Sequence, residues 1–386
     1  DGHDELWIGA ARGARMAVFK RDTEGMFQPL KIEPDQAMPD DLAGLAAWVD
    51  TRGRPRMLAA LAQYESPQPE RPSFLVFQHS DTRPDIAVRA TPQSSLGAAS
   101  PGPIAVADFD GDADLDVFVG GRIVPGSYPT PADSVLFRND NGVLTPVGDE
   151  GMIFKNLGLV SAAVWSELTG DAFPELVLAC EWGPVKIFRN ARGRLLPWSP
   201  PVHLPRRSKS EPPVIIPLDQ LTGWWNSVTT GDFDGDGRLD VVAGNWGRND
   251  AYQASHAHPL TLYYGNLAQR GVTDLIESYY VPELGEEAPL RTLGALGQAF
   301  PSLVAAYPSH RAFSETTTAR LLSSLPVKPS RLQVNCLDSM LFLNRETYWE
   351  ARPLPDEAQL APAFGLSVAD INGDGHEDLF VSQNFF

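Results

Sequence analysis

The apolar residues of this chain fall in short runs, and an acidic segment precedes each of the clearest ones. A run of this length that is bounded by turn residues predicts a buried β-strand, because helices in globular proteins are usually longer. The clearest runs are Val117-Phe118-Val119-Gly120, Leu176-Val177-Leu178-Ala179, Val241-Val242-Ala243-Gly244 and Leu379-Phe380-Val381.

A second kind of apolar run ends in a polar turn and predicts a β-hairpin. The clearest examples are Phe137-Arg138-Asn139 with Gly142, Phe188-Arg189-Asn190 with Gly193, and Leu341-Phe342-Leu343-Asn344. The two kinds of run alternate along the chain. The repeating unit is therefore an acidic loop, a strand, a connection and a hairpin.

The spacing of the acidic residues indicates what neutralises their charge. In the loop from Asp232 to Asp240, carboxylates stand at the first, third, fifth and ninth positions, and Gly237 stands at the sixth. Crowded like charges repel, and an all-oxygen cage of this kind suits a hard cation, most naturally calcium. Three loops share this spacing. Their candidate metal-site residues are Asp232, Asp234, Asp236, Arg238 and Asp240; Asp108, Asp110, Asp112, Asp114 and Asp116; and Asp370, Asn372, Asp374, His376 and Asp378.

Two other interpretations of a single loop stay open. Asp-Gly is common turn chemistry, so an isolated acidic loop could be a solvated turn. An EF-hand would need a twelve-residue loop that ends in glutamate and has a helix on each side. Recurrence of the spacing, with a strand after each loop, favours the metal site.

Weaker copies keep the frame of the loop but lose ligands. The fourth copy is Glu167, Thr169, Asp171 and Glu175, which we expect to bind calcium weakly because it lacks the sixth-position glycine. A fifth copy keeps only Asp50 and Gly53, a sixth keeps only Asn266, Gly271 and Asp274, and residues 1–7 resemble the end of a further copy. The Asp232 loop should bind best, since the Asp108 loop has Ala113 at the sixth position and the Asp370 loop has Asn372 at the third.

The intact loops from Asp108 to Asp232 recur about 60 residues apart, and a repeat with about four short strands predicts a blade of a β-propeller. We predict an all-β fold in which residues 1–386 form a single propeller, seven-bladed or alternatively six-bladed. Both ends fall within a repeat, so we expect a fragment of a longer chain. Helical spacing of apolar residues predicts two or three short helices inserted within a blade at residues 289–325.

The loops resemble FG-GAP (VCBS-type) repeats, the calcium-binding blades of integrin α-subunit propellers. Further stretches resemble bacterial proteins of the cartilage acidic protein/ASPIC-UnbV group. They are Gly223-Trp224-Trp225-Asn226-Ser227, Gly244-Asn245-Trp246-Gly247, Glu181-Trp182, Leu354-Pro355 and Ala358-Gln359-Leu360-Ala361-Pro362. The resemblance implies a calcium-binding propeller with a role in adhesion.

Composition limits the partners. A net charge of −18 argues against nucleic acid and against an anionic membrane surface. The chain has no apolar run long enough for a membrane helix. Extracellular calcium modules work at about 10⁻⁴ to 10⁻³ M calcium, which predicts an extracellular, periplasmic or cell-surface location. The two cysteines, Cys180 and Cys336, are expected to be buried thiols rather than a disulfide.

We find no catalytic motif in the sequence, so we expect a binding module rather than an enzyme. Ligands should bind where the strands end, opposite the acidic loops, and a glycan or a protein would suit the residues there. The candidate rim residues are Arg122, Glu181, Trp182, Asn245, Trp246, Asn384 and Phe385. A scaffold for a polysaccharide- or ester-processing enzyme and an architectural spacer remain the alternatives. The tryptophans could also be wedges between blades.

Overall fold

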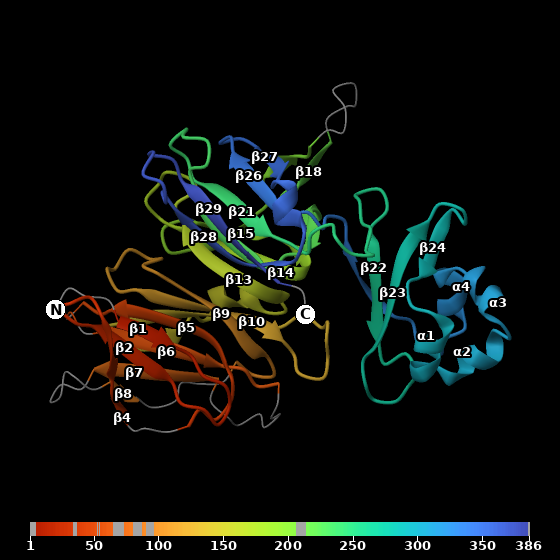
Figure 1. Ribbon diagram of the computed structural model, residues 1–386, viewed down its shortest axis with the longest axis horizontal. Coiled ribbons are helices and arrows are strands. Elements are labelled where there is room, and N and C mark those ends of the chain that lie inside the picture. The colour runs from red at the N-terminus through yellow and green to blue at the C-terminus, as the bar shows by residue number, and fades with distance from the viewer. Residues whose placement is uncertain are drawn as a thin grey trace. The chain divides into compact units, whose positions relative to one another are not determined.

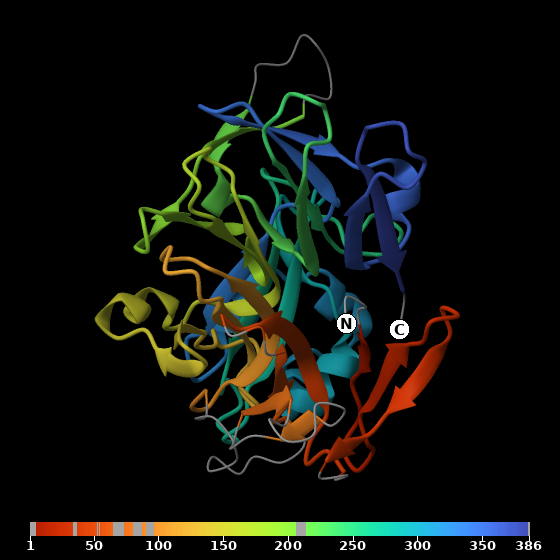
Figure 2. The same ribbon diagram turned by 90° about the vertical axis from the view of Figure 1, so that its left-hand side faces the viewer.

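The computed structural model describes residues 5–33, 37–51, 53, 55–64, 73–79, 87–89, 96–205 and 214–384. It is mostly β, and its strands form small, mainly antiparallel sheets of the kind that make propeller blades (Figures 1 and 2). The predicted all-β class is therefore confirmed. The chain divides into two compact units, and each is described by itself.

The first unit comprises Asp1–Pro125, Thr130–Val177 and Phe188–Pro197. One sheet has the order β1-β2-β3, with β1 (Glu5–Ile8), β2 (Ala17–Arg21) and β3 (Phe27–Leu30). The next has the order β4-β8-β7-β6-β5, with β4 (Ile32–Glu33), β5 (Leu42–Val49), β6 (Pro55–Leu61), β7 (Phe74–His79) and β8 (Ala87–Arg89). The third has the order β12-β11-β10-β9, with β9 (Ser100–Ala107), β10 (Asp116–Ile123), β11 (Val135–Asp140) and β12 (Val143–Pro146).

Apolar side chains from β5 to β11 form a shared core in this unit. Phe74 packs edge to face on Phe137 at a centroid distance of 5.6 Å, and both are buried. Val117 and Val119 lie in the same cluster. The run from Val117 to Gly120 is thus a buried strand, as its composition predicts. A 3₁₀ helix, η1 (Asp149–Phe154), follows the third sheet.

A five-stranded sheet contains residues of both units, because the division falls within three of its strands, β14, β15 and β16. Its order is β13-β14-β15-β16, and β19 also pairs with β14. The strands are β13 (Leu159–Ser166), β14 (Glu175–Pro184), β15 (Lys186–Asn190), β16 (Leu195–Trp198) and β19 (Thr222–Trp224).

The second unit comprises Gly126–Pro129, Leu178–Ile187 and Trp198–Phe386. Its largest sheet has the order β18-β17-β27-β26-β21-β20. The strands are β17 (Pro201–His203), β18 (Ile215–Pro217), β20 (Ser227–Gly231), β21 (Asp240–Gly244), β26 (Met340–Asn344) and β27 (Trp349–Pro353). The 3₁₀ helices are η2 (Leu218–Gln220) and η3 (Asp356–Gln359), and the last sheet pairs β28 (Ala363–Ala369) with β29 (Asp378–Gln383).

A long insertion separates β21 from β26, although these two strands are hydrogen-bonded neighbours. It carries a sheet of order β24-β23-β22-β25, with β22 (Leu260–Gly265), β23 (Asp274–Val281), β24 (Glu286–Pro289) and β25 (Ser330–Val334). The four helices are α1 (Leu293–Ala299), α2 (Pro301–Ala306), α3 (His310–Ser314) and α4 (Thr318–Ser323), and they lie beside β23 and β24 in Figure 1. The helical insertion is confirmed, with four helices where the sequence predicted two or three.

The position of this insertion bears on the repeat count. The weak copy from Asn266 to Asp274 joins β22 to β23, so it lies inside the insertion. The described residues form seven sheets. If the inserted sheet is not a blade, six sheets remain, and six is the alternative number of blades given in the sequence prediction. Within the described ranges, no helix has the length and apolarity needed to cross a membrane.

Candidate functional site

Each acidic loop joins two neighbouring antiparallel strands of one sheet. The loop from Asp108 joins β9 to β10, the loop from Glu167 joins β13 to β14, the loop from Asp232 joins β20 to β21, and the loop from Asp370 joins β28 to β29. The ninth residue of every loop is also the first residue of the second strand or lies at its start. The prediction that each loop leads directly into a strand is therefore confirmed.

The first carboxylate organises the backbone of its loop. Asp232 Oδ1 accepts hydrogen bonds from the backbone N–H groups of Gly235 (2.8 Å) and Asp236 (3.1 Å), and Oδ2 accepts one from Gly237 (2.9 Å). Asp108 and Asp370 accept the equivalent three bonds. These bonds hold the loop in one conformation before any cation is added.

Two positions of the loop adopt a left-handed backbone, which glycine tolerates best. In the Asp232 loop they are Gly235 (φ 73°) and Gly237 (φ 83°). The sequence pattern indicated only the second of them. At the sixth position, alanine holds the same conformation in two of the other three loops, as Ala113 (φ 72°) and Ala172 (φ 69°), and Gly375 (φ 85°) holds it in the third.

In three of the four loops the ninth carboxylate is buried and joins the loop to the neighbouring hairpin. Asp240 Oδ2 accepts from the backbone of Phe233 (3.1 Å), and Oδ1 accepts from the backbone of Asn344 (2.8 Å). Asp116 and Glu175 have the same arrangement. Burial raises the pKa of Asp116 to about 7 and that of Asp240 to about 6, and it also raises the pKa of Glu175.

The hairpin asparagines are the residues that sequence reasoning missed at this site. The side-chain amide of Asn139 donates to the Leu115 carbonyl at the eighth position of the Asp108 loop (2.9 Å). Asn190 and Asn344 donate to the equivalent carbonyls of Pro174 (3.1 Å) and Leu239 (3.3 Å). All three asparagines are buried. The sequence did carry a signal for these residues, because an asparagine recurs at the end of each hairpin run.

The geometry of two loops fits a hard cation. Asp108, Asp110 and Asp112 each offer a carboxylate oxygen within 4.8 Å of the others, and so do Asp232, Asp234 and Asp240. Asp110 Oδ1 is buried and has no hydrogen-bond partner among the described residues, so a cation would satisfy it. Calcium prefers such a set of oxygen ligands. In the Asp370 loop, by contrast, the Asn372 amide donates to Asp374 Oδ2 (3.1 Å).

Arginine side chains neutralise part of the charge in these loops. Arg345 Nη1 lies 2.5 Å from Asp234 Oδ2 and 3.2 Å from Asp236 Oδ2, and Arg238 also pairs with Asp236. Burial would lower the pKa of Arg345, but its hydrogen bonds to and charge attraction for Asp234 and Glu350 together outweigh burial and raise the pKa. In the first unit, Arg138 Nε lies 2.7 Å from Asp110 Oδ2.

In the weaker copies of the loop, an arginine also pairs with a remaining aspartate. In the weak copy at Asn266, Arg270 stands at the fifth position and pairs with Asp274 at the ninth (2.6 Å). In the copy at Asp50, the carboxylate pairs with Arg56 (3.1 Å). In both of these copies a guanidinium therefore lies beside the remaining carboxylate and neutralises it.

The predicted rim residues differ in their surroundings. Asn245 is fully buried: its Oδ1 accepts from the backbone of Trp224 (3.0 Å) and Trp246 (2.9 Å), and its Nδ2 donates to the carbonyls of Cys336 (3.0 Å) and Asp338 (3.2 Å). The prediction that Asn245 is exposed for a ligand is wrong, because backbone groups already use its whole amide.

The tryptophans of the second unit form an aromatic cluster. Trp224 lies edge to face with Trp182, Trp246 and Tyr252, at centroid distances of 5.0, 4.9 and 4.7 Å. Trp182 and Trp224 are buried, whereas Trp246 is half-buried. The Trp182 indole donates to Tyr128 Oη (2.7 Å), which donates to Glu181 (2.6 Å). Trp182 therefore packs inside the unit, as the wedge interpretation has it.

The remaining rim residues are dispersed. Asn384 is exposed, and its backbone donates to the Pro362 carbonyl (3.1 Å). Arg122 is half-buried in the first unit, and Phe385 lies outside the described residues.

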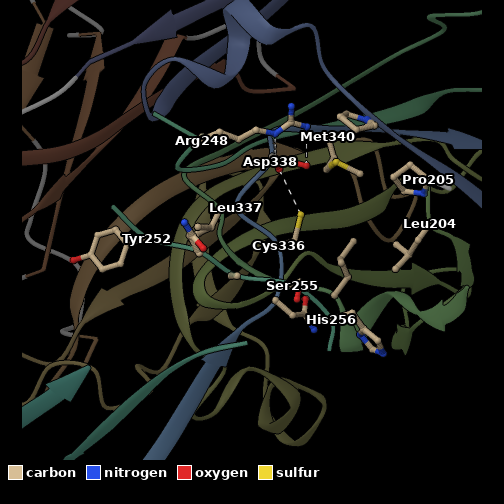
Figure 3. Close-up of a pocket in the computed structure, with 16 residues that line it drawn as sticks. Leu204, Pro205, Arg248, Tyr252, Ser255, His256, Cys336, Leu337, Asp338 and Met340 are labelled. Atoms are coloured by element: carbon tan, nitrogen blue, oxygen red, sulfur yellow. Dashed lines mark hydrogen bonds and ion pairs between the residues drawn. The ribbon is translucent and has the colours of Figure 1, made fainter. Parts of the chain in front are cut away.

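A cavity of about 610 Å³ lies at the far end of β21 from the Asp232 loop (Figure 3). Its walls come from the segment after β21, the segment before β26, and residues near β17 and β19. They include Arg248, Tyr252, His256, Asn335, Cys336, Asp338 and Met340. Arg248 forms a two-point ion pair with Asp338, through Nε (2.5 Å) and Nη2 (3.0 Å). The sequence predicted that a ligand would bind at this end of the strand, but it indicated none of these residues.

Cys180 and Cys336 form no disulfide, as predicted. The Cys336 thiol donates to the Asp338 carbonyl at 3.7 Å. Burial, with a smaller contribution from Asp338, raises the pKa of this thiol to about 12. It stays protonated at neutral pH and is a poor nucleophile.

One sequence-family model matches a part of the chain. Residues 167–243 match the sequence model of the FG-GAP-like repeat. This segment contains the loops from Glu167 and from Asp232, so the repeat predicted from the acidic spacing is confirmed there. No curated protein matches the chain.

Solved structures with similar coordinates share little sequence with this chain. Sqt1 of Saccharomyces cerevisiae is 10% identical with a TM-score of 0.39, and the match covers 98% of this chain and 90% of Sqt1. The allergen Mala s 1 of Malassezia sympodialis is 8% identical with a TM-score of 0.32, and the match covers 62% of this chain and 83% of the allergen.

Proposed function

We propose that the protein is an extracellular, calcium-stabilised β-propeller that binds a glycan or protein partner and belongs to the cartilage acidic protein/ASPIC-UnbV group. One observation carries the proposal: the cavity and the Asp232 loop lie at opposite ends of β21. A strand of five residues spans about 17 Å. Calcium at the loop would then stabilise the strand without occupying the binding surface.

The calcium role rests on the donor sets of the Asp108 and Asp232 loops. Because an unfolded chain lacks the cage, calcium bound there adds to folding stability. The extracellular location follows from the calcium concentration that such sites require.

A binding role is better supported than catalysis. The one thiol in the cavity has a pKa of about 12, so it is unsuited to nucleophilic chemistry. Asp338 is engaged by Arg248, which leaves that carboxylate paired with a permanent cation. A polysaccharide- or ester-processing enzyme therefore remains the second candidate, and an architectural spacer the third.

The test is a glycan and peptide array probed with labelled protein, with 1 mM calcium and with EDTA. We expect binding in calcium, loss of binding in EDTA, and weaker binding of Arg248→Ala. Arg311→Ala is the control, since Arg311 forms an ion pair with Glu315 (3.2 Å) and neither residue lines the cavity. No ligand of either class, or binding that Arg248→Ala leaves unchanged, would reject the proposal.

A further inference from the structure

We infer that the cavity beside Arg248 binds a neutral saccharide unit through its hydroxyl groups. The inference rests on the proposed binding function and names its ligand class. The cavity volume of about 610 Å³ falls within the range of about 300–1,000 Å³ that small-molecule sites occupy. All of its lining residues lie in the second unit.

The charged groups at the cavity are arranged as a fixed donor and acceptor pair. Arg248 engages Asp338 through Nε and Nη2, and its Nη1 lies 3.2 Å from Asp356. A guanidinium has five N–H donors, so donors remain beyond these three contacts, and carboxylate oxygens accept more than one bond. A hydroxyl group both donates and accepts, so it can bridge such a pair, whereas a simple ion cannot.

The balance of charge disfavours an ionic ligand. Two carboxylates compensate one guanidinium, so the cluster carries a net negative charge that would repel a phosphate or a carboxylate. The chain as a whole has a net charge of −18, which adds to this effect. A cationic ligand would meet the guanidinium of Arg248, which is 47% exposed. A neutral polar ligand avoids both penalties.

The remaining walls of the cavity suit the other face of a sugar ring. Leu204, Pro205 and Met340 are among the lining residues, and Figure 3 shows them on one side of Cys336, with Arg248 and Asp338 above it and Ser255 and His256 below it. Saccharides present C–H groups on one face and hydroxyl groups at the edge. Apolar side chains next to a few placed polar groups are typical of such sites.

Asn245 is the positioning residue of this site. Its amide donates to the carbonyls of Cys336 and Asp338, so it fixes the segment that carries the Asp338 carboxylate. Gly247 is required next to it: a Cβ there would lie 2.5 Å from the Gln359 carbonyl, and its φ is 90°. The Asn-Trp-Gly sequence after β21 thus builds the cavity instead of lining an exposed rim.

The experiment follows the Met340 methyl signal in protein labelled with ¹³C-methyl methionine. The probes are methyl α-D-mannopyranoside, methyl β-D-galactopyranoside and methyl β-D-glucuronide, each titrated in calcium. We expect at least one neutral glycoside to shift the Met340 signal, which Met340→Leu assigns, and the glucuronide to bind more weakly. Asp338→Asn should weaken binding by about tenfold or more, because it removes a charged acceptor.

Controls separate this inference from the proposed function. Arg311→Gln, which removes the ion pair of Arg311 with Glu315, should leave the titration unchanged. If Asp338→Asn does not fold, Arg248→Lys, which keeps the charge but loses the forked guanidinium, should weaken binding. Tighter binding of the glucuronide, or a glycoside that shifts other methionines but not Met340, overturns the inference. An array peptide that shifts Met340 while no glycoside does so overturns the saccharide and leaves the binding function intact. If no probe and no array ligand binds, both the saccharide inference and the proposed binding function are rejected.

Discussion

The backbone N–H of Asn139 lies 2.8 Å from Asp116 Oδ1, and both residues are fully buried. The same pairing joins Asn344 to Asp240 at 2.8 Å and Asn190 to Glu175 at 3.3 Å. Each pair links an acidic loop to the hairpin beside it. The loop is therefore part of the sheet, and a change in the hairpin should be felt at the loop.

Asn139→Ala should destabilise the protein by about 1–3 kcal/mol, because it leaves the Leu115 carbonyl and the Gly142 N–H without their partner. Chemical denaturation in calcium measures this change. Val143→Ala, at an exposed position of the same hairpin, should cost little and serves as the control. Equal effects of the two substitutions would contradict the structural role of Asn139.

Ala113→Gly should stabilise the protein, and Gly237→Ala should destabilise it, each by about 1 kcal/mol. Both residues have a left-handed backbone, and no atom lies within 4 Å of a Cβ at Gly237, so only backbone strain changes there. Thermal denaturation of the two variants provides the comparison. A change of the same sign in both would show that contacts, rather than φ, decide the effect.

Removal of calcium should lower the melting temperature, because binding at 100 times the Kd contributes about 2.7 kcal/mol per site. Differential scanning fluorimetry with EDTA and stepwise calcium tests this, and magnesium serves as the control ion. Native mass spectrometry should show one calcium fewer in Asp236→Ala and no change in Asp219→Asn, which lies outside the loops. An unchanged stoichiometry in Asp236→Ala would remove the Asp232 loop from the list of calcium sites.

Arg345→Gln should tighten calcium binding by about fivefold, or 1 kcal/mol, because the guanidinium contacts two carboxylates that a cation in the Asp232 loop would use. The calcium-free protein should become less stable in the same variant. Arg352→Gln is the control, since Arg352 also contacts Glu350 but has no contact with the loop among the ion pairs of the described residues. Weaker calcium binding in Arg345→Gln would mean that the arginine supports the site.

Cys336 should resist alkylation in the folded protein at pH 8. A pKa of about 12 leaves on the order of 1,000-fold less thiolate than an ordinary cysteine has. Iodoacetamide labelling followed by peptide mass spectrometry, with and without denaturant, measures the difference. Rapid labelling of Cys336 in the native state would show a reactive thiol in the cavity and would revive the enzymatic alternative.

The local elements of this protein follow from short segments of its sequence. A loop such as Asp232–Asp240 has its charge spacing, its glycines and its following strand in one short segment, so local rules suffice to predict it. The hairpin at Phe137–Asn139 is equally local, and so is the helical spacing near Leu293 and Leu296. These elements are where the sequence and the structure agree.

How these elements meet depends on strand pairing between distant parts of the chain. Asn344 and Asp240 lie 104 residues apart, on either side of the β22–β25 insertion, and only the pairing of β21 with β26 brings them together. The same pairing places Arg345 on Asp234 and carries Asp338 to Arg248. It also buries Asn245. The sequence suggested that this polar side chain binds a ligand. Its burial depends on long-range packing, which the spacing of neighbouring residues does not encode.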